Sequence, residues 1–540
     1  MASLNPISSV ANLGRERAAH LLRRTTFGPT RQDIDTFANY TIDQALAILL
    51  DIKELPVPPT DPATGESWVN PRPGAGNSEE DDLKEYVKYW WGDLMINDGN
   101  SIIEKMVWWY HTHLTTIISR VPESTAVYNQ LALFRFYALG NFKTACNKVC
   151  YDNAMLYNLD GRLNVKGNVQ ENFSREFFEL YTIGKGPQLS QIDYTNYTEE
   201  DVKAGARLLS GFDVDTSFTN IDEESGVALG ILKGNGITAN QHDLDPKTFS
   251  NKFQSATLNT TSDAVADVLA ELQEFVDMIF NQDETARYIC RRLYRFFVYY
   301  QIPEEVENDI ITPLAATFRN NDYELLPVLD QLLRSQHFFD EDNGITTDDN
   351  IGAIIKSPLD LTLGALRYFN VQMPDKSTDL VSHYEAWGRI LNPWGIIAGQ
   401  GLNFYEPFDV VGYEAYHQVP AFNRNWISPN NLMQRYQLSS PLVDGTTNED
   451  GELLFQINIY PYMTNQGVNL DDENAIVQHF VDNMFPEPIT QERFDYFVTV
   501  LLNGEELWST VAENPDLDII TEHLRELTKA LLASPEYQLM

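Results

Sequence analysis

The sequence has little cysteine and no long apolar run. Cys146, Cys150 and Cys290 are the only cysteines among 540 residues. A set of cysteines that is so small and odd in number excludes a disulfide framework, and no Cys-x-x-Cys pair is present. The absence of any run of 18 apolar residues excludes a membrane-spanning helix. The first thirty residues also lack the apolar stretch of a signal peptide, so none is predicted in the sequence as written, although a processed chain numbered from a new Met would look the same.

Positive charge is scarce as well. The 38 Lys and Arg residues face 78 Asp and Glu residues, which gives a formal net charge of −40. A chain this acidic repels nucleic acid and anionic membrane surfaces, so neither is an expected partner. The hydrophobic fraction of 43% and the aromatic fraction of 12% are those of a folded globular protein.

Helical periodicity dominates the pattern of apolar residues. Residues 262–280 carry apolar side chains at helical spacing after Ser262, which we predict to be an N-cap. Ser357 and Thr198 precede two further helices, each with an aspartate three residues on. The glycines at 234–236 predict a turn between two strands. The sequence therefore predicts a mainly α protein, a large irregular helical domain with long loops and one or two short β-hairpins.

No shift in composition and no internal repeat divides the chain. We therefore predict a single elaborate helical domain over residues 1–540. Residues 54–80, which are rich in proline, glycine and acidic residues, are predicted to form a surface insertion. Residues 210–262 and 403–431 are predicted to be long loop regions, and loops of this length in a compact fold tend to be functional or disordered.

Residues 171–184, "ENFSREFFELYTIG", place charged residues among bulky aromatic ones. Phenylalanine and leucine residues at i, i+4 and i+7 predict a helix with one buried face. The charged residues Glu171, Arg175, Glu176 and Glu179 fall on the other faces, where further aromatic side chains leave little room for solvent. Because buried carboxylates need an arginine or a metal as partner, this helix predicts one or the other.

Several ordered blocks of the sequence form a recognisable series. They are "AAHLLRRTTFGPT" (18–30), "EKMVWWYHTHL" (104–114), "DNAMLYNLDG" with "ENFSREFFELYTIG", "TEEDVKAGARLLSGF", "HDLDPKTF", "ICRRLYRFFV" and "IKSPLDLTLGALR". In this order they resemble a bacterial family catalogued as domain of unknown function 1800. The chain departs from the family pattern in "EPFDVVGY", where Glu406 replaces a proline and Tyr413 a tryptophan. The resemblance implies a mainly helical fold, export of many relatives and a sulfatase-like protein encoded nearby, but no established activity.

Histidines and carboxylates in these blocks raise the hypothesis of a site for a divalent metal ion. Glutamates at i, i+3 on a helix are a spacing used in carboxylate metal sites, whereas histidines at i, i+2 on a helix point apart. The predicted metal ligands are His111, His113, Glu176 and Glu179. The predicted catalytic residues are Glu176, Glu179, His242 and Asp243. The alternative is a buried hydrogen-bonded network that shapes the core.

Two arginine-rich segments, 15–31 and 287–295, stand out in so acidic a chain. One interpretation is a pocket for a carboxylate, sulfate or phosphate group, because guanidinium groups bind such anions through two hydrogen bonds. The predicted substrate-binding residues are His20, Arg24, Arg175, Arg291 and Arg292. The alternative, which the sequence favours, is that these arginines neutralise the carboxylates of residues 171–179.

Two classes of function follow. The first is a metal-assisted hydrolase-like enzyme that acts on an anionic or sugar-like substrate at the His/Glu/Arg polar cluster. The second is a non-catalytic binding or assembly protein that works with the sulfatase-like partner. Polar blocks that meet at one solvent-open pocket would favour the enzyme, whereas blocks that pair internally beneath an exposed aromatic patch would favour the partner protein.

Overall fold

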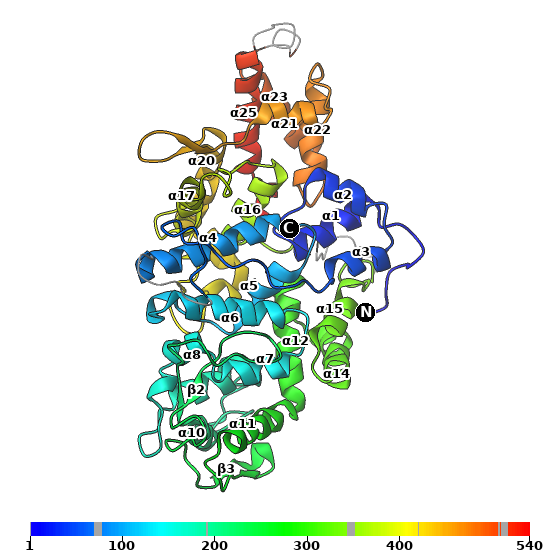
Figure 1. Ribbon diagram of the computed structural model, residues 1–540. Coiled ribbons are helices and arrows are strands. Elements are labelled where there is room, and N and C mark those ends of the chain that lie inside the picture. The colour runs from blue at the N-terminus through cyan, green and yellow to red at the C-terminus, as the bar shows by residue number, and fades with distance from the viewer. Residues whose placement is uncertain are drawn as a thin grey trace.

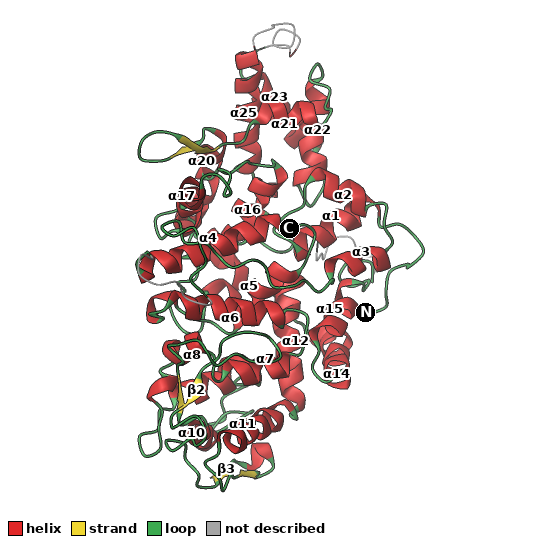
Figure 2. Cartoon of the chain, viewed as in Figure 1, coloured by secondary structure: helices red, strands yellow, loops and turns green. Residues whose placement is uncertain are grey.

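The computed structural model describes residues 2–69, 78–190, 193–342, 351–419, 421–505, 508 and 517–540. Helices dominate these residues and the strands are short, which confirms the predicted mainly α fold (Figure 2). The part of the chain that the structure describes contains no helix that is both long enough and apolar enough to cross a membrane.

The helices follow one another along the whole chain. The first group comprises α1 (Gly14–Thr25), α2 (Arg31–Phe37), α3 (Ile42–Leu49), α4 (Glu80–Asn97), α5 (Ile103–His113), η1 (Ile118–Arg120), α6 (Ser124–Phe136), α7 (Phe142–Val149), α8 (Asn153–Asn158), η2 (Gly161–Leu163), α9 (Asn172–Glu176) and η3 (Phe177–Thr182). The second comprises α10 (Glu199–Leu208), η4 (Asn251–Phe253), α11 (Val265–Phe280), α12 (Asp283–Phe297), α13 (Glu304–Val306), η5 (Glu307–Ile311), α14 (Thr312–Asn320) and α15 (Leu325–Leu333). The third comprises α16 (Pro358–Tyr368), α17 (Leu380–Leu391), α18 (Ile396–Gly399), η6 (Glu414–Tyr416), η7 (Phe422–Ile427), α19 (Pro429–Gln437), α20 (Ser439–Val443), α21 (Ile459–Asn465), α22 (Glu473–Met484), α23 (Gln491–Leu502), α25 (Leu517–Leu532) and η8 (Glu536–Gln538).

In the described part of the chain, three antiparallel strand pairs interrupt the helices. They are β1 (Phe212–Asp213) with β2 (Ile231–Leu232), β3 (Lys247–Thr248) with β4 (Thr257–Leu258), and β5 (Thr446–Thr447) with β6 (Leu453–Phe455). The turn predicted at residues 234–236 does not join two paired strands, because β2 pairs with β1, which precedes it in the chain. Among the described residues, region 210–262 contains β1 to β4 and η4, and region 403–431 contains η6, η7 and the start of α19.

Helix starts follow the predicted caps where the signal is local. The Ser357 side chain accepts the amide of Asp360, and Thr198 forms a capping box with Asp201. The prediction of Ser262 as an N-cap was wrong, because α11 begins at Val265. The chain just before α11 pairs with residues 237–239 instead, and this pairing holds it extended for two more residues.

The elements form an elongated molecule (Figure 1). Helices α21 to α25 lie at one end, α7 to α11 with β2 and β3 at the other, and α1, α4, α5 and α16 between them. The C-terminal residue lies in this middle part, beside α1 and α16. The buried apolar side chains form a single cluster that extends from Ile7 to Tyr537. The division of the chain into domains stays a prediction.

The predicted surface insertion is tied to the core at its described residues. Trp68 is fully buried and donates its indole N–H to the Ser124 hydroxyl at 2.9 Å. Asp61 is buried as well and accepts the amide and the hydroxyl of Ser78. Residues 54–69 therefore run over the molecule with anchored side chains, and residues 70–77 of the predicted insertion lie outside the described residues.

Candidate functional site: a buried cationic pocket

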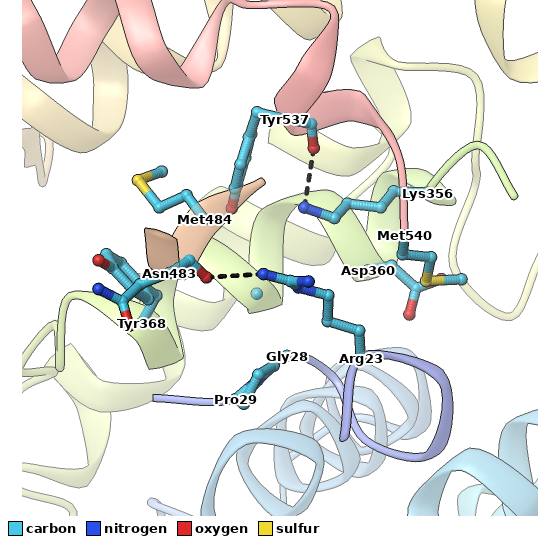
Figure 3. A pocket seen from close by; sticks show the side chains of 11 residues that line it. Arg23, Gly28, Pro29, Lys356, Asp360, Tyr368, Asn483, Met484, Tyr537 and Met540 are labelled. Atoms are coloured by element: carbon cyan, nitrogen blue, oxygen red, sulfur yellow. Dashed lines mark hydrogen bonds between the residues drawn. The ribbon is translucent and has the colours of Figure 1, made fainter. Parts of the chain in front are cut away.

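A small pocket of about 30 Å³ lies where α1, α16, the end of α22 and the C-terminal turn meet (Figure 3). Its size suits only a small chemical group. Its charged lining residues are Arg23, Lys356 and Asp360, and Tyr368, Asn483 and Tyr537 supply polar atoms. The site thus joins residues that are several hundred positions apart in the sequence.

Two glycines explain how α16 comes so close to the loop after α1. Gly28 has a φ of +99°, and a Cβ atom there would lie 2.7 Å from the Gly364 Cα atom. Only glycine accepts both this backbone conformation and this close approach. The "FGP" of the first sequence block and the "TLGAL" of the last one therefore pack directly on each other and form one wall of the pocket.

The start of α16 places two charges at the pocket. Ser357 caps the helix, Pro358 occupies its first position and Asp360 follows at N3. Lys356 precedes the cap and is 8% exposed, with its ammonium group inside the protein. The predicted local cap therefore also determines where Lys356 and Asp360 lie.

Asp360 forms an ion pair with a lysine from a different helix. The Lys105 ammonium group on α5 contacts one Asp360 carboxylate oxygen, and the Ser357 hydroxyl donates to the other at 2.8 Å. Both charged side chains are nearly inaccessible to solvent, at 2% and 9% exposed. The Lys105 ammonium group thus already balances the negative charge of Asp360.

The two cations that line the pocket bind neutral acceptors. Arg23 donates to the Asn483 carbonyl at 2.9 Å, and Lys356 donates to the Tyr537 carbonyl at 2.8 Å. Figure 3 shows both cationic groups reaching toward the same space. Within the described ranges, neither side chain has a carboxylate within ion-pair distance. Neither cation therefore has a direct ion pair there, and the attraction of Asp360 for Lys356 and of Glu487 for Arg23 acts without direct contact.

Two further arginines increase the positive charge around the site. Arg24 donates to the carbonyls of Phe297 and Val298, and Arg435 donates to Gln538 and to the Lys356 carbonyl. Arg435 is 0% exposed, and its Nη1 atom has no hydrogen-bond partner. Arg435 has no ion pair among the described residues, and a buried guanidinium with an unsatisfied N–H is costly, so Arg435 favours a bound anion nearby.

Burial dominates the pKa values of these cations. Burial lowers the pKa of Lys356 well below its ordinary value of 10.5, and repulsion from Arg23 adds to this effect. Burial likewise lowers the pKa of Arg23 to about 10, of Arg24 to about 9 and of Arg435 to about 10. A bound anion would reverse these shifts.

Of the predicted substrate-binding residues, two belong to this region. His20 and Arg24 lie on α1, on either side of Arg23 in the chain, and His20 lines an adjoining groove that Arg23 also lines. The His20 ring nitrogen Nε2 lies 2.9 Å from the Phe338 carbonyl oxygen. Burial lowers the pKa of His20 well below 6.5, so the ring is neutral near pH 7.

The other predicted arginines lie elsewhere and have partners of their own. Arg175 forms two short hydrogen bonds to Glu199 and a longer one to Glu171 at 3.3 Å. Arg291 binds Glu284 and both carboxylate oxygens of Glu307. Arg292 donates to the backbone carbonyls of Thr112 and Tyr416. Apart from the pair of Arg175 with Glu171, the arginine rows therefore do not neutralise the carboxylates of residues 171–179.

The two predicted histidine ligands lie inside the all-buried helix α5. The His111 Nε2 atom lies 3.4 Å from the Tyr413 hydroxyl, and its ring packs against Tyr405 at 4.2 Å. The His113 Nε2 atom lies 2.9 Å from the Tyr181 carbonyl, and its ring stacks on Trp109. Burial lowers both pKa values, that of His111 to about 3. Each ring thus belongs to a different aromatic cluster.

The predicted catalytic pair His242 and Asp243 is held in two ion-pair networks. The His242 Nε2 atom lies 2.9 Å from a Glu271 oxygen, and Lys247 donates to the same carboxylate. Asp243 accepts two hydrogen bonds from the Arg207 guanidinium. No group of three or more His, Cys, Asp or Glu side chains suited to a metal ion occurs in the described ranges. The structure therefore does not bring the proposed metal ligands together.

Glu176 and Glu179 lie where the helix of residues 172–182 widens. Residues 177–182 form a π-helix, and such irregular turns are frequent at functional sites. Glu179 binds Lys185 at 2.9 Å and accepts the Tyr197 hydroxyl at 2.8 Å. Helix α9 begins at Asn172, and Asn168 closes a tight turn with Val165 just before it.

Glu176 differs from its neighbour because the described residues offer it no hydrogen bond or ion pair. Burial, with repulsion from Glu179 and Asp409, raises its pKa from 4.5 to about 7. The folded protein therefore holds this proton more tightly than the unfolded chain does. The resulting stability is fully present below pH 4.5 and is lost as the pH rises to about 7.

We therefore expect Glu176→Gln to stabilise the protein above pH 7 by about 1–2 kcal/mol and to change little below pH 4.5. The amide removes a half-buried charge that has no partner. Urea unfolding at both pH values measures the difference. Glu179→Gln is the matched control and should destabilise the protein, because the amide removes the negative charge that faces Lys185 and one of the two oxygens that accept from Lys185 and Tyr197. A loss of stability in Glu176→Gln above pH 7 would show that this carboxylate has a favourable partner.

Residue-type reasoning missed the central members of the pocket. Lys105 lies in a helix that is buried on all sides, so its charge had to be buried and paired, and this was the available signal. Asp360 was recognised only as a capping residue, and Lys356 was not singled out. Their meeting depends on tertiary packing between α5 and the start of α16, which spacing along the chain does not reveal.

Fold and site together define a mainly helical protein with a buried, cation-rich pocket. The chain belongs to the family described as protein of unknown function (DUF1800), whose model matches residues 20–539. That match contains Arg23, Lys356, Asp360 and Tyr537. Comparisons with curated proteins and with solved structures gave no match.

Proposed function

We propose that the protein binds a small anionic group, a carboxylate, sulfate or phosphate, in the pocket between α1 and α16. The observation that carries this proposal is the arrangement of charge. Arg23 and Lys356 face the pocket with only neutral acceptors, whereas Asp360, the one carboxylate among the described lining side chains, is paired with Lys105.

The energetics favour an anion over any other occupant. An isolated buried cation costs several kcal/mol, and a bound anion offsets that cost because attraction between charges is strong where water is excluded. The Arg23 guanidinium offers a planar donor set to oxygen anions, and the Lys356 ammonium adds a point charge. The aromatic rings of Tyr368 and Tyr537 exclude water from the lining.

For an enzyme, this pocket supports the anionic half of the hydrolase hypothesis. An anionic substrate would bind through Arg23 and Lys356, with the Tyr368 and Tyr537 hydroxyl groups in the same lining. Metal assistance has no comparable support, because His111, His113, Glu176 and Glu179 lie in separate networks. We therefore propose anionic substrates and leave the metal out of the proposal.

The test is calorimetric titration of the full chain with sodium sulfate, sodium phosphate and sodium acetate at constant ionic strength. We expect saturable binding of at least one of them. Arg23→Met and Lys356→Met should each weaken binding about tenfold or more, because each removes a charge-assisted contact. Arg17→Met is the matched control on α1, since Arg17 is surface-exposed and pairs with Glu341. Unchanged affinity in both pocket variants, or no binding of any of the three anions, would contradict the proposal.

A second candidate function is binding of a partner protein. Phe408, in the loop where the chain departs from the family pattern, is 95% exposed, and Trp394 is 81% exposed. Large exposed aromatic side chains are typical of interaction surfaces. The partner we propose is the sulfatase-like protein implied by the resemblance. Sedimentation of the two purified proteins together should show a complex that Phe408→Ser weakens, and independent sedimentation would end this alternative.

A further inference from the structure

Lys356 differs from the other buried lysine of the site. Lys105 contacts the Asp360 carboxylate, which keeps an ammonium group charged. The Lys356 Nζ atom instead lies 2.8 Å from the Tyr537 carbonyl oxygen and 3.7 Å from the centre of the Tyr537 ring. It faces the pocket, and among the described residues no carboxylate lies within ion-pair distance of it.

While the pocket holds no anion, the surroundings of Lys356 favour an uncharged amine. Arg23 and Arg435 are the nearby cations that repel a further positive charge, and neither guanidinium readily releases a proton. Lysine is therefore the side chain of this cluster that can lose one. A neutral amine still donates one N–H to the Tyr537 carbonyl, and its lone pair is then free to act as a nucleophile.

We propose that Lys356 is the reactive amine of this pocket and forms an imine with a carbonyl compound that carries an anionic group, such as a 2-oxo acid. Arg23 binds the anionic group while the carbonyl carbon meets Nζ. This inference rests on the proposed function, because it assigns the bound anion to the carboxylate of the same molecule. It goes further by giving the pocket a covalent chemistry.

The reaction balances without an oxidant or a cofactor. The Nζ lone pair attacks the carbonyl carbon, the C–N bond forms, and the π electrons move to the carbonyl oxygen. One amine proton passes to that oxygen to give a carbinolamine. The C–O bond then breaks, the second amine proton leaves with the oxygen as water, and a C=N bond remains. The Tyr368 and Tyr537 hydroxyl groups in the lining can relay these protons.

The experiment uses pyruvate as probe and sodium cyanoborohydride as trap. Hydride reduces the imine to a stable secondary amine, so the labelled lysine gains the mass of pyruvic acid less one oxygen atom. Peptide mass spectrometry then compares Lys356 with Lys203, an exposed lysine on α10, in the same sample. We expect about tenfold or more labelling at Lys356 near pH 7, because an exposed lysine is almost fully protonated there.

Variants identify the groups involved. Lys356→Met is neutral and of similar length, so it adds no charge to the buried pocket; it cannot form an imine and should lose the label while keeping a cooperative melting transition. Arg23→Met should remove the preference for pyruvate over acetone, which lacks the anionic group. Arg17→Met should label like the parent.

The outcomes separate the two proposals. If sulfate, phosphate or acetate binds but Lys356 is labelled no more than Lys203, the reactive amine is refuted and the anion site stands. Suppose that pyruvate and acetone label Lys356 equally and that none of the three anions binds. The anion site is then refuted, and so is the proposal that Arg23 binds the anionic group of the carbonyl compound. Preferential labelling by pyruvate that depends on Arg23 supports the inference.

Discussion

Replacing Asp360 with asparagine should destabilise the protein by about 3–5 kcal/mol, because it leaves the buried Lys105 ammonium group without its counter-charge. Asp360 also provides the nearest negative charge for Lys356 and Arg435, whose pKa values it raises against the effect of burial. One substitution thus exposes several buried cations to mutual repulsion. Urea unfolding followed by circular dichroism measures the loss of stability.

A double-mutant cycle separates charge from helix capping. Lys105→Met combined with Asp360→Asn should recover part of the loss, because the orphaned ammonium group is then gone. Asp201→Asn is the matched control, since Asp201 is a fully buried capping carboxylate at N3 of α10 with no ion pair in the described ranges. Its substitution should cost about 1–2 kcal/mol, the value of a cap. Equal losses of stability in Asp360→Asn and Asp201→Asn would show that charge plays no special part at Asp360.

The sequence predicted those features whose causes are local. The caps at Ser357 and Thr198 depend on residues three positions apart, and both are present. Gly184, just after the helix of residues 172–182, has the left-handed conformation that favours glycine at such an end, with a φ of +73°. Ser262 failed as a cap because residues 237–239, distant in the chain, pair with the segment before α11. Tertiary pairing there overrides a correct local preference.

The candidate site was only partly predictable for the same reason. The arginines of α1 were identified from composition, and Arg24 does lie beside the pocket. The expectation that arginines neutralise the carboxylates of residues 171–179 failed. Arg175 instead binds Glu199 on the adjacent α10, and Arg291 binds Glu307 on η5. Charge pairing depends on which helices pack together, and the spacing of charges within one helix does not determine that. Lys356 and Lys105 meet Asp360 only in the folded chain.

Glu271 holds the second buried charge network, and its replacement by glutamine should cost about 3–5 kcal/mol near pH 7. Its carboxylate accepts Lys247 at 2.8 and 2.9 Å, lies 2.9 Å from the His242 ring, and accepts the Thr260 amide. Lys247 is completely buried, so the amide variant leaves its charge uncompensated. Exposed Glu274 on the same helix provides the control, and Glu274→Gln should unfold like the parent.

The pKa of Glu271 determines how its contribution to stability changes with pH. Burial alone would raise the Glu271 pKa, but hydrogen bonds from His242 and Lys247 outweigh it and hold the pKa below 4.5. A depressed pKa gives stability that is present above 4.5 and is lost as the pH falls through the folded value. The gap between the parent and Glu271→Gln should therefore persist at neutral pH and narrow in acid. Urea unfolding across this range tests it, with Lys247→Met added to restore part of the loss. If Glu271→Gln instead unfolds like the parent at neutral pH, His242 and Glu271 are not a structural ion-pair network, and a catalytic role for His242 regains its support.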